Sequence, residues 1–261
     1  MTTTHNTTKS IKFEHPLNER YRFFLRLEFL FDLVKHNISS PAAVDSHTAL
    51  GAILDIINVV SRIDIKSEGL KELDRITATL NPLKNATDIE QGRLDEILSS
   101  IKETAAKLRA INGPIDQALK EVELFKVLQQ RNSIAGGLCD FDLPAYRYWL
   151  AQSPKTRSQD LHQWFQPFNP LRYAIEIALK LVRESNTAKH ELAQNGVYSQ
   201  TLDSKIPCQL ISVTLPQNTI YFVEFSGGKH RFTIRFLDAT QHPRAMPTQQ
   251  NVNFDLSCCI L

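Results

Sequence analysis

The spacing of apolar residues changes along the chain, from a period near 3.6 over the first two thirds to a period of two near the end. Apolar residues at intervals of three and four from Leu17 to Leu33 predict an amphipathic helix with a broad apolar face that includes Tyr21, Phe24 and Phe29. A second apolar stripe predicts a core helix that is capped by Asp45 or Ser46 and ends near residue 62.

The helical pattern continues with two longer helices. We expect one from Ser67 to Asn81, since the ring of Pro82 disfavours a helical residue before it. Thr87 and Glu90 then form a capping box for a helix over residues 94–108. The break at residues 112–114 is followed by apolar residues at helical spacing over 115–125, which predicts an antiparallel helical hairpin. Further helices are expected around residues 146–150, 161–165 and 170–182.

Beyond residue 196 the apolar residues alternate with polar ones, which is typical of strands with one buried face. Four segments follow this pattern: QLISVTL, TIYFVEF, HRFTIRF and NVNFDLSC. We therefore expect a small antiparallel sheet. In the third segment the apolar residues Phe232, Ile234 and Phe236 share one face, and Arg231 and Arg235 share the other. The preceding glycines, 227 and 228, are expected to form the turn of a hairpin.

These elements predict the α+β class, with an N-terminal all-α helical domain followed by a small antiparallel β-sheet domain. We assign residues 1–12 to a disordered extension, residues 13–192 to the α-helical domain and residues 193–261 to the β-strand domain.

Composition and charge narrow the function classes. The net charge is +2, from 30 basic and 28 acidic residues, so the chain lacks the global positive field of a general nucleic-acid binder. No apolar run approaches the ~20 residues of a membrane span, and the start lacks the apolar core of a secretory signal. We expect a cytoplasmic protein that does not bind membranes.

The four cysteines form no CxxC pair and have no spaced histidines nearby, so we expect reduced thiols and no metal site. The last four residues formally match a prenylation box. They directly follow an alternating pattern, VNFDL, so we expect a terminal strand there instead.

Catalytic motifs are weak throughout. Ser226 and Lys229 have the spacing SxxK, but the SDN and KTG elements of the penicillin-binding enzymes do not occur. The GGK of the same loop lacks the remaining P-loop spacing and precedes a strand, so it presents no helix N-terminus to a phosphate. The motifs GxSxG and HExxH are also missing. We predict that the protein is not an enzyme and uses no cofactor.

Six blocks of the sequence resemble the ZapD family of bacterial cell-division proteins: IKFEHPLNERYRFFLRLEFL, GLKELDR, RNSIAGGLCDFDLPAYRYWL, FNPLRYAI, NGVYSQ and GGKHRFTIRF. The resemblance runs from about Phe13 to Cys259 and is weaker in residues 37–60, 81–113 and 238–250. It implies a non-enzymatic, cytoplasmic division factor that forms a homodimer. The implied dimer binds the C-terminal tail of the tubulin-like protein FtsZ and bundles FtsZ filaments at the division septum at midcell.

The resemblance also implies a cationic pocket for that tail. The matching basic residues are Arg26, Arg62, Arg147 and Arg231, with Lys229 and Arg235 as weaker neighbours. Relatives can have histidine in place of Arg147, and a relative can carry arginine in place of Glu123, which implies a rearranged pocket edge. We expect Arg231 to face the arginines of the helical domain across one cleft.

Two alternative functions compete with this reading. Arginines on a strand with aromatic residues nearby could grip a nucleic-acid backbone, although the predicted burial of Phe232 and Phe236 prevents them from stacking on bases. A hydrolase using Ser226 and Lys229 would need a desolvated lysine, and a glycine hairpin turn is a poor place for one.

Overall fold

The computed structural model describes residues 10–86, 90–131, 134, 136–139, 141–203, 205–240 and 244–261. The chain forms two compact units. Unit 1 consists of Met1–Arg22 and Leu179–Leu261, and unit 2 consists of Phe23–Ala178. The predicted α+β class, a helical region followed by antiparallel strands, is confirmed.

In the described residues of unit 2 the regular structure is helical. The helices in chain order are α1 (Glu19–Asn37), α2 (Ala43–Val60), α3 (Ile65–Leu80), η1 (Asn81–Asn85), α4 (Gln91–Arg109), α5 (Gln117–Lys120), α6 (Glu123–Arg131), α7 (Pro144–Leu150), α8 (Pro154–Phe165), η2 (Gln166–Phe168) and α9 (Asn169–Glu184). The chain passes between the units within α1 and within α9.

Helix α1 buries a stripe that differs from the predicted one. Tyr21 and Phe24 are buried as expected, and Leu27 and Phe31 continue their stripe at helical spacing. Phe29 is 66% exposed, so it does not share the buried face with Tyr21 and Phe24 as the spacing predicted. The apolar residues of α1 are too many for one face of a helix, and packing against the rest of unit 2 selects the stripe that contains Leu27.

Helix α2 begins earlier than predicted. Its first residue is Ala43, and its N-cap residue, Ala42, makes no side-chain cap hydrogen bond. The predicted cap residue Ser46 is buried and accepts a hydrogen bond from Nε of Arg157 at 3.0 Å. A tertiary contact therefore uses the hydroxyl that the sequence pattern assigned to a helix cap.

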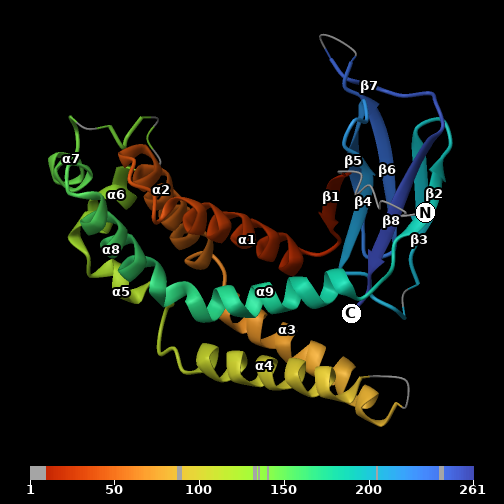
Figure 1. Ribbon diagram of the computed structural model, residues 1–261, viewed down its shortest axis with the longest axis horizontal. Helices are drawn as coiled ribbons and strands as arrows, with labels where there is room; N and C mark the ends of the chain where they lie inside the picture. The colour runs from red at the N-terminus through yellow and green to blue at the C-terminus, as the bar shows by residue number, and fades with distance from the viewer. Residues whose placement is uncertain are drawn as a thin grey trace, which may run out of the picture. The chain divides into compact units, whose positions relative to one another are not determined.

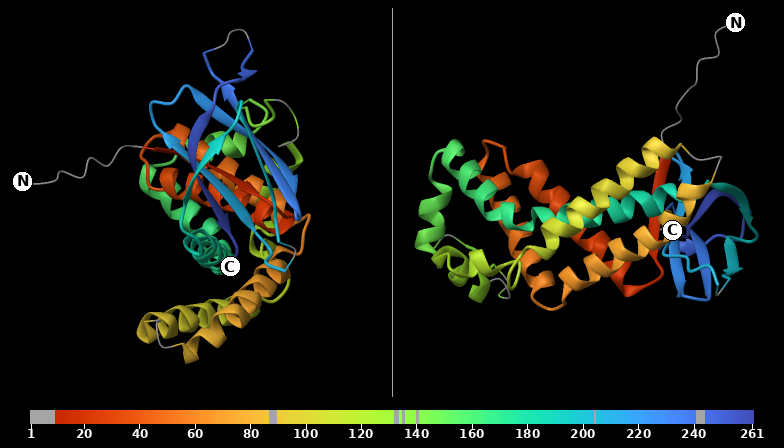
Figure 2. Two further views of the ribbon diagram at one scale, coloured as in Figure 1. Left: turned by 90° about the vertical axis from the view of Figure 1, so that its right-hand side faces the viewer. Right: turned by 90° about the horizontal axis from the view of Figure 1, so that it is seen from below.

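The helical hairpin of unit 2 is formed by α3 and α4, which lie side by side (Figures 1 and 2). The predicted hairpin between residues 94–108 and 115–125 is wrong, because α5 and the first part of α6 occupy the latter segment. Gly69 of α3 faces this contact, and a Cβ there would lie 3.4 Å from Cδ2 of Leu108 on α4, an ordinary van der Waals distance. The predicted capping residue Thr87 lies outside the described residues, and Glu90 is the N-cap residue of α4.

Among the described helices, α2 is the one long and apolar enough to cross a membrane, with a mean hydropathy of 1.3 over 18 residues. Its apolar side is buried in unit 2, where Leu50, Ile53 and Ile57 are at most 2% exposed. This burial is that of the core helix that the sequence predicted.

Strands form unit 1 together with the ends of α1 and α9. The strands in chain order are β1 (Ser10–Pro16), β2 (Lys189–Ala193), β3 (Val197–Thr201), β4 (Leu210–Pro216), β5 (Tyr221–Gly228), β6 (Arg231–Asp238), β7 (Met246–Pro247) and β8 (Val252–Cys259). Sheet A has the order β1-β4-β8-β2, and sheet B has the order β3-β6-β5 with β7 added to β6. All pairs are antiparallel.

Four of these strands, β4, β5, β6 and β8, are the predicted ones, and they lie in two sheets rather than one. The sequence patterns did not reveal β1, β2, β3 and β7. Of the predicted disordered extension, residues 1–9 lie outside the described residues, and residues 10–12 begin strand β1. The predicted domain boundaries, 13–192 and 193–261, stay predictions.

Both sheets contribute side chains to one hydrophobic core. Phe232, Ile234 and Phe236 of β6 are fully buried, as the alternation predicted. The ring centroid of Phe236 lies 5.0 Å from that of Phe254 on β8 of sheet A. A core shared by the inner faces of two sheets is the arrangement of a β-sandwich.

The β5–β6 hairpin differs from the prediction in its turn. Gly228 pairs with Arg231, so Lys229 and His230 form the turn, and the glycines end strand β5. Gly227 has φ 155°, and a Cβ there would lie 2.6 Å from Cα of Phe232. The glycine therefore permits a close approach between two strands.

Candidate functional site

Arg26 and Arg62 line the same pocket, between α1 and the C-terminal end of α2. We call it the α1–α2 pocket, and its cavity volume is about 400 Å³. Its apolar lining residues are Phe23, Phe29, Leu30, Val59 and Ile63, and its polar ones are Arg26, Asp55, Asn58 and Arg62. The pocket therefore combines two guanidinium groups with an apolar wall that includes the exposed ring of Phe29.

Helix periodicity places these side chains together. On α1, Phe23, Arg26 and Leu30 follow intervals of three and four residues, and on α2 Asp55 and Asn58 are three residues apart. Arg62 lies in the turn after Val60, the last residue of α2. Residues 38–42 connect the two helices, and so short a connection is typical of antiparallel neighbours. One face of each helix thus borders the pocket.

The charged groups of the α1–α2 pocket are unpaired. Within the part of the chain that the structure describes, Arg26, Asp55 and Arg62 take part in no ion pair. Elsewhere in unit 2, Lys35 lies 2.7 Å from Asp32, and many other surface cations also have carboxylate partners. Cζ of Arg26 lies 5.7 Å from the ring centroid of Phe23, a cation–π distance.

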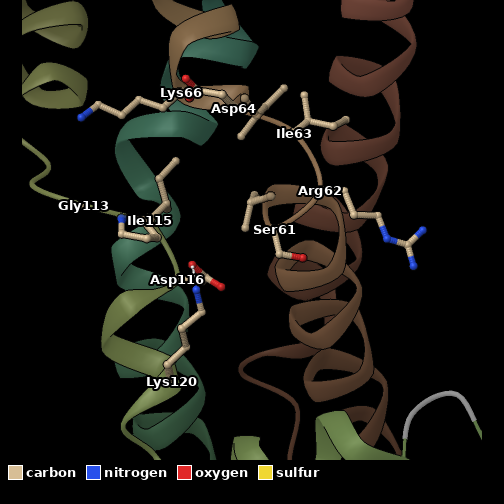
Figure 3. Close-up of a pocket in the computed structure, with 12 residues that line it drawn as sticks. Ser61, Arg62, Ile63, Asp64, Lys66, Gly113, Ile115, Asp116 and Lys120 are labelled. Atoms are coloured by element: carbon tan, nitrogen blue, oxygen red, sulfur yellow. Dashed lines mark ion pairs between the residues drawn. The ribbon is translucent and has the colours of Figure 1, made fainter.

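A second pocket of about 460 Å³ lies at the α2–α3 connection (Figure 3). Most charged groups of this pocket have partners within the protein. Nζ of Lys120 lies 3.1 Å from Oδ1 of Asp116, and Nζ of Lys66 donates to the carbonyl of Ile111 at 2.5 Å. Arg62 borders both pockets, and in Figure 3 its side chain extends away from Asp116 and Lys120. We therefore assign the guanidinium group of Arg62 to the α1–α2 pocket.

Arg147 lies on α7, which packs at the other end of α2. Its neighbour Tyr146 hydrogen-bonds Nδ1 of His47, near the start of α2. From His47 to Val60, the last residue of α2, the helical rise is about 20 Å, and Arg62 lies in the turn beyond it. The structure thus brings Arg26 and Arg62 together at one pocket and places Arg147 about four turns of helix away.

The other predicted cations lie on the β5–β6 hairpin of unit 1. Arg231 and Arg235 are exposed on the outer face of sheet B, and Lys229 is exposed in the turn. Between the two arginines, Oγ1 of Thr233 lies 2.9 Å from Oγ of Ser199 on β3. This face is open and polar, unlike the α1–α2 pocket. That Arg231 faces the helical arginines across one cleft stays a prediction.

Sequence reasoning gave a site role only to Arg26 and Arg62 among the residues of the α1–α2 pocket. Phe29 was placed on the apolar face of the first helix, and Asp55 received no role. The sequence does contain a signal for Phe29. It lies three residues after Arg26, on the same side of the helix as that charged residue, and away from the stripe of Phe24, Leu27 and Phe31.

Reactive groups show no catalytic arrangement in the described residues. No group of three or more His, Cys, Asp or Glu side chains there is placed to hold a metal ion. Ser226 and Lys229 are both exposed at the β5–β6 hairpin, and the four cysteines are free thiols. Recognition by charge and apolar contact is therefore the chemistry that the candidate site offers.

Comparisons with known proteins agree on one family. The family model described as ZapD, cell division protein, matches residues 25–235. The chain is 37% identical to Cell division protein ZapD of Methylococcus capsulatus over 251 residues, which cover 96% of this chain and 98% of the relative. It is 36% identical to Cell division protein ZapD of Chromobacterium violaceum over 250 residues, which cover 95% of this chain and 99% of the relative.

Proposed function

This chain belongs to the ZapD family of cell division proteins, and on that premise we propose that it binds the C-terminal tail of FtsZ through a cationic pocket. The protein is a non-enzymatic cell division protein. In our proposal it acts as a homodimer in the cytoplasm at the midcell division ring. There it cross-links FtsZ filaments into bundles.

The observation that carries the proposal is the α1–α2 pocket. Arg26 and Arg62, which have no carboxylate partner among the described residues, border a pocket whose apolar wall includes Phe29. An acidic side chain gains charge-assisted hydrogen bonds from guanidinium groups, and a neighbouring apolar side chain gains burial against the wall. A short tail that is partly acidic and partly apolar matches both properties.

Weak single contacts are sufficient for this role. A filament displays many tails, and a dimer offers two tail sites, so the second binding event on the same filament becomes intramolecular. Linked sites of this kind exceed the affinity of either one by about 10² or more when the geometry allows both to engage. Bundling then follows from valency rather than from one tight contact.

Nucleic-acid binding is the competing function, and the outer face of sheet B is its best surface. Arg231 and Arg235 are exposed there, but Phe232 and Phe236 are fully buried and have no ring surface to offer to bases. A filter-binding assay at increasing salt separates the two functions, since nucleic-acid affinity falls steeply with salt.

The direct test measures binding of a fluorescent FtsZ tail peptide and co-sedimentation with FtsZ filaments. We expect the double variant Arg26→Glu, Arg62→Glu to lose at least about 30-fold in peptide affinity, because repulsion replaces two charge-assisted contacts. Phe29→Ser should lose about 10-fold without losing stability, since the ring that it removes is 66% exposed.

The matched control is the double variant Lys102→Glu, Lys155→Glu, which makes the same change in net charge at two exposed positions of unit 2. It should bind as the wild type does. Unchanged pelleting and peptide affinity of the Arg26→Glu, Arg62→Glu variant, with an intact circular dichroism spectrum, would remove the pocket proposal.

A further inference from the structure

The α1–α2 pocket contains a carboxylate as well as two guanidinium groups. Asp55 is exposed and lies on the face of α2 that also presents Asn58 to the pocket, and Arg62 follows in the turn after the helix. Its neighbours in sequence, Leu54 and Ile56, are fully buried on the opposite side. The orientation of α2 in its core therefore directs Asp55 outward.

Nothing in the described residues explains Asp55 as a structural group. The other carboxylate of α2, Asp45, accepts a hydrogen bond from Ser40 at the start of the helix. Asp55 makes no hydrogen bond or ion pair with any residue that the structure describes. A solvated carboxylate in the middle of α2, on the wall of a pocket, is available to a ligand.

Asp55 does not neutralise Arg62. The two side chains form no ion pair in the described residues, and Arg62 lies in the turn after Val60, the last residue of α2. At the helical rise per residue, seven positions place the two backbones about 10 Å apart. The wall that α2 contributes is therefore negative at the Asp55 end and positive at the Arg62 end. Asn58, between them, offers both a donor and an acceptor.

We propose that Asp55 makes the α1–α2 pocket selective for a peptide segment of mixed charge. The acidic residue of the segment pairs with Arg26 and Arg62, an apolar residue contacts the wall, and a cationic residue pairs with Asp55. In an extended peptide, which advances about 3.3 Å per residue, the two charged residues are about three positions apart. This inference rests on the proposed function and names the ligand chemistry of the same pocket.

The experiment uses three short synthetic peptides that differ at one position. The first has an acidic residue, two apolar residues and a lysine in that order, and the other two replace the lysine with glutamine or with glutamate. For the wild-type protein we expect the lysine peptide to bind about 5-fold more tightly than the glutamine peptide, and the glutamate peptide to bind about 5-fold more weakly still.

Substitutions at Asp55 then test the assignment. Asp55→Asn should bind the lysine and glutamine peptides equally, and Asp55→Lys should reverse the order so that the glutamate peptide binds best. Glu96→Gln, which removes one exposed carboxylate from α4, is the matched control and should keep the wild-type order. Asp55→Asn with wild-type preferences, or Asp55→Lys without reversal, would overturn the inference.

The outcome is separable from that of the proposed function. If Arg26→Glu, Arg62→Glu abolishes binding of all three peptides while Asp55 variants keep the wild-type order, the pocket stands and the selectivity fails. If the arginine variant binds all three as the wild type does, the proposed function itself fails.

Discussion

The two ends of helix α2 use arginine in opposite ways. At the N-terminal end, Arg157 of α8 is 5% exposed. Its guanidinium group donates to Oγ of Ser46 at 3.0 Å and to the carbonyls of Pro41 at 2.7 Å, Leu150 at 3.2 Å and Gln152. At this end the side chain ties a loop and two helices together.

At the C-terminal end of α2, Arg62 is exposed and, like Arg26 across the pocket, forms no ion pair with the residues described. The two sites differ in whether the N–H donors of the guanidinium group already have acceptors within the protein. The hydrogen bonds of Arg157 are used to satisfy backbone carbonyls, so this arginine stabilises unit 2. The guanidinium groups of Arg26 and Arg62 are open to a ligand, so these arginines can serve recognition at little cost to the fold.

Removal of the buried arginine should give the largest effect on stability. Arg157→Leu leaves the carbonyls of Pro41, Leu150 and Gln152 without their donor, and we expect a loss of about 2–4 kcal/mol in the free energy of unfolding of unit 2. Urea unfolding followed by tryptophan fluorescence measures it, because Trp149 and Trp164, the chain's two tryptophans, both lie in unit 2.

The contrast between the buried and the exposed arginines fails if substitution of Arg26 and Arg62 destabilises unit 2 as much as substitution of Arg157. Arg26→Glu, Arg62→Glu should change the free energy of unfolding by less than about 0.5 kcal/mol. A loss as large as that of Arg157→Leu would show that the pocket arginines are structural.

An arginine of unit 1 sharpens the comparison, because its partner is a carboxylate. Nε and Nη2 of Arg183 donate to Glu14 at 3.0 and 2.7 Å, and Nζ of Lys12 lies 2.9 Å from the same carboxylate. Burial acts to raise the pKa of Glu14, but the hydrogen bonds from Arg183 and Lys12 outweigh it and lower that pKa below 4.5. The stabilisation is therefore present above pH 4.5 and is lost as pH falls through the lowered pKa of the folded state.

We expect Arg183→Met to lower the stability of unit 1 by about 1–3 kcal/mol at neutral pH and by less in acid. Hydrogen exchange of the β1 and β4 amides at several pH values measures this loss. The cost of Arg157→Leu should show no such dependence over the same range, since its acceptors are carbonyls and a hydroxyl. A cost of Arg183→Met that stays constant down to pH 3 would contradict the role of Glu14.

The smallest effect is expected on the outer face of sheet B. Arg231→Glu, Arg235→Glu should weaken binding of the FtsZ tail peptide by less than about 5-fold and only at low salt, because charges on an open surface are screened. Peptide titrations at two salt concentrations measure it. An effect equal to that of the pocket variant at physiological salt would mean that both surfaces contact the tail directly.

The hydrophobic pattern of the sequence predicted most of the long helices and four of the strands. The alternation in β6 predicted the buried faces of Phe232 and Phe236 correctly, because side-chain direction in a strand has a strict period of two. Strand β1 was missed because seven residues of mixed composition carry little local signal. Its pairing with β4, about 200 residues later, comes from long-range contacts such as Glu14 opposite Ser212.

For the candidate site, too, the sequence indicated some features and tertiary packing decided others. The residues alone, through the resemblance of their order and spacing to one family, indicated the family, the helical and β regions, and Arg26 and Arg62 as candidates. Tertiary packing decided that these two arginines share a pocket, that Phe29 lies outside the core and that Asp55 is part of the pocket wall. The reason is physical: one helix can bury only some of its apolar residues, and its neighbours select which.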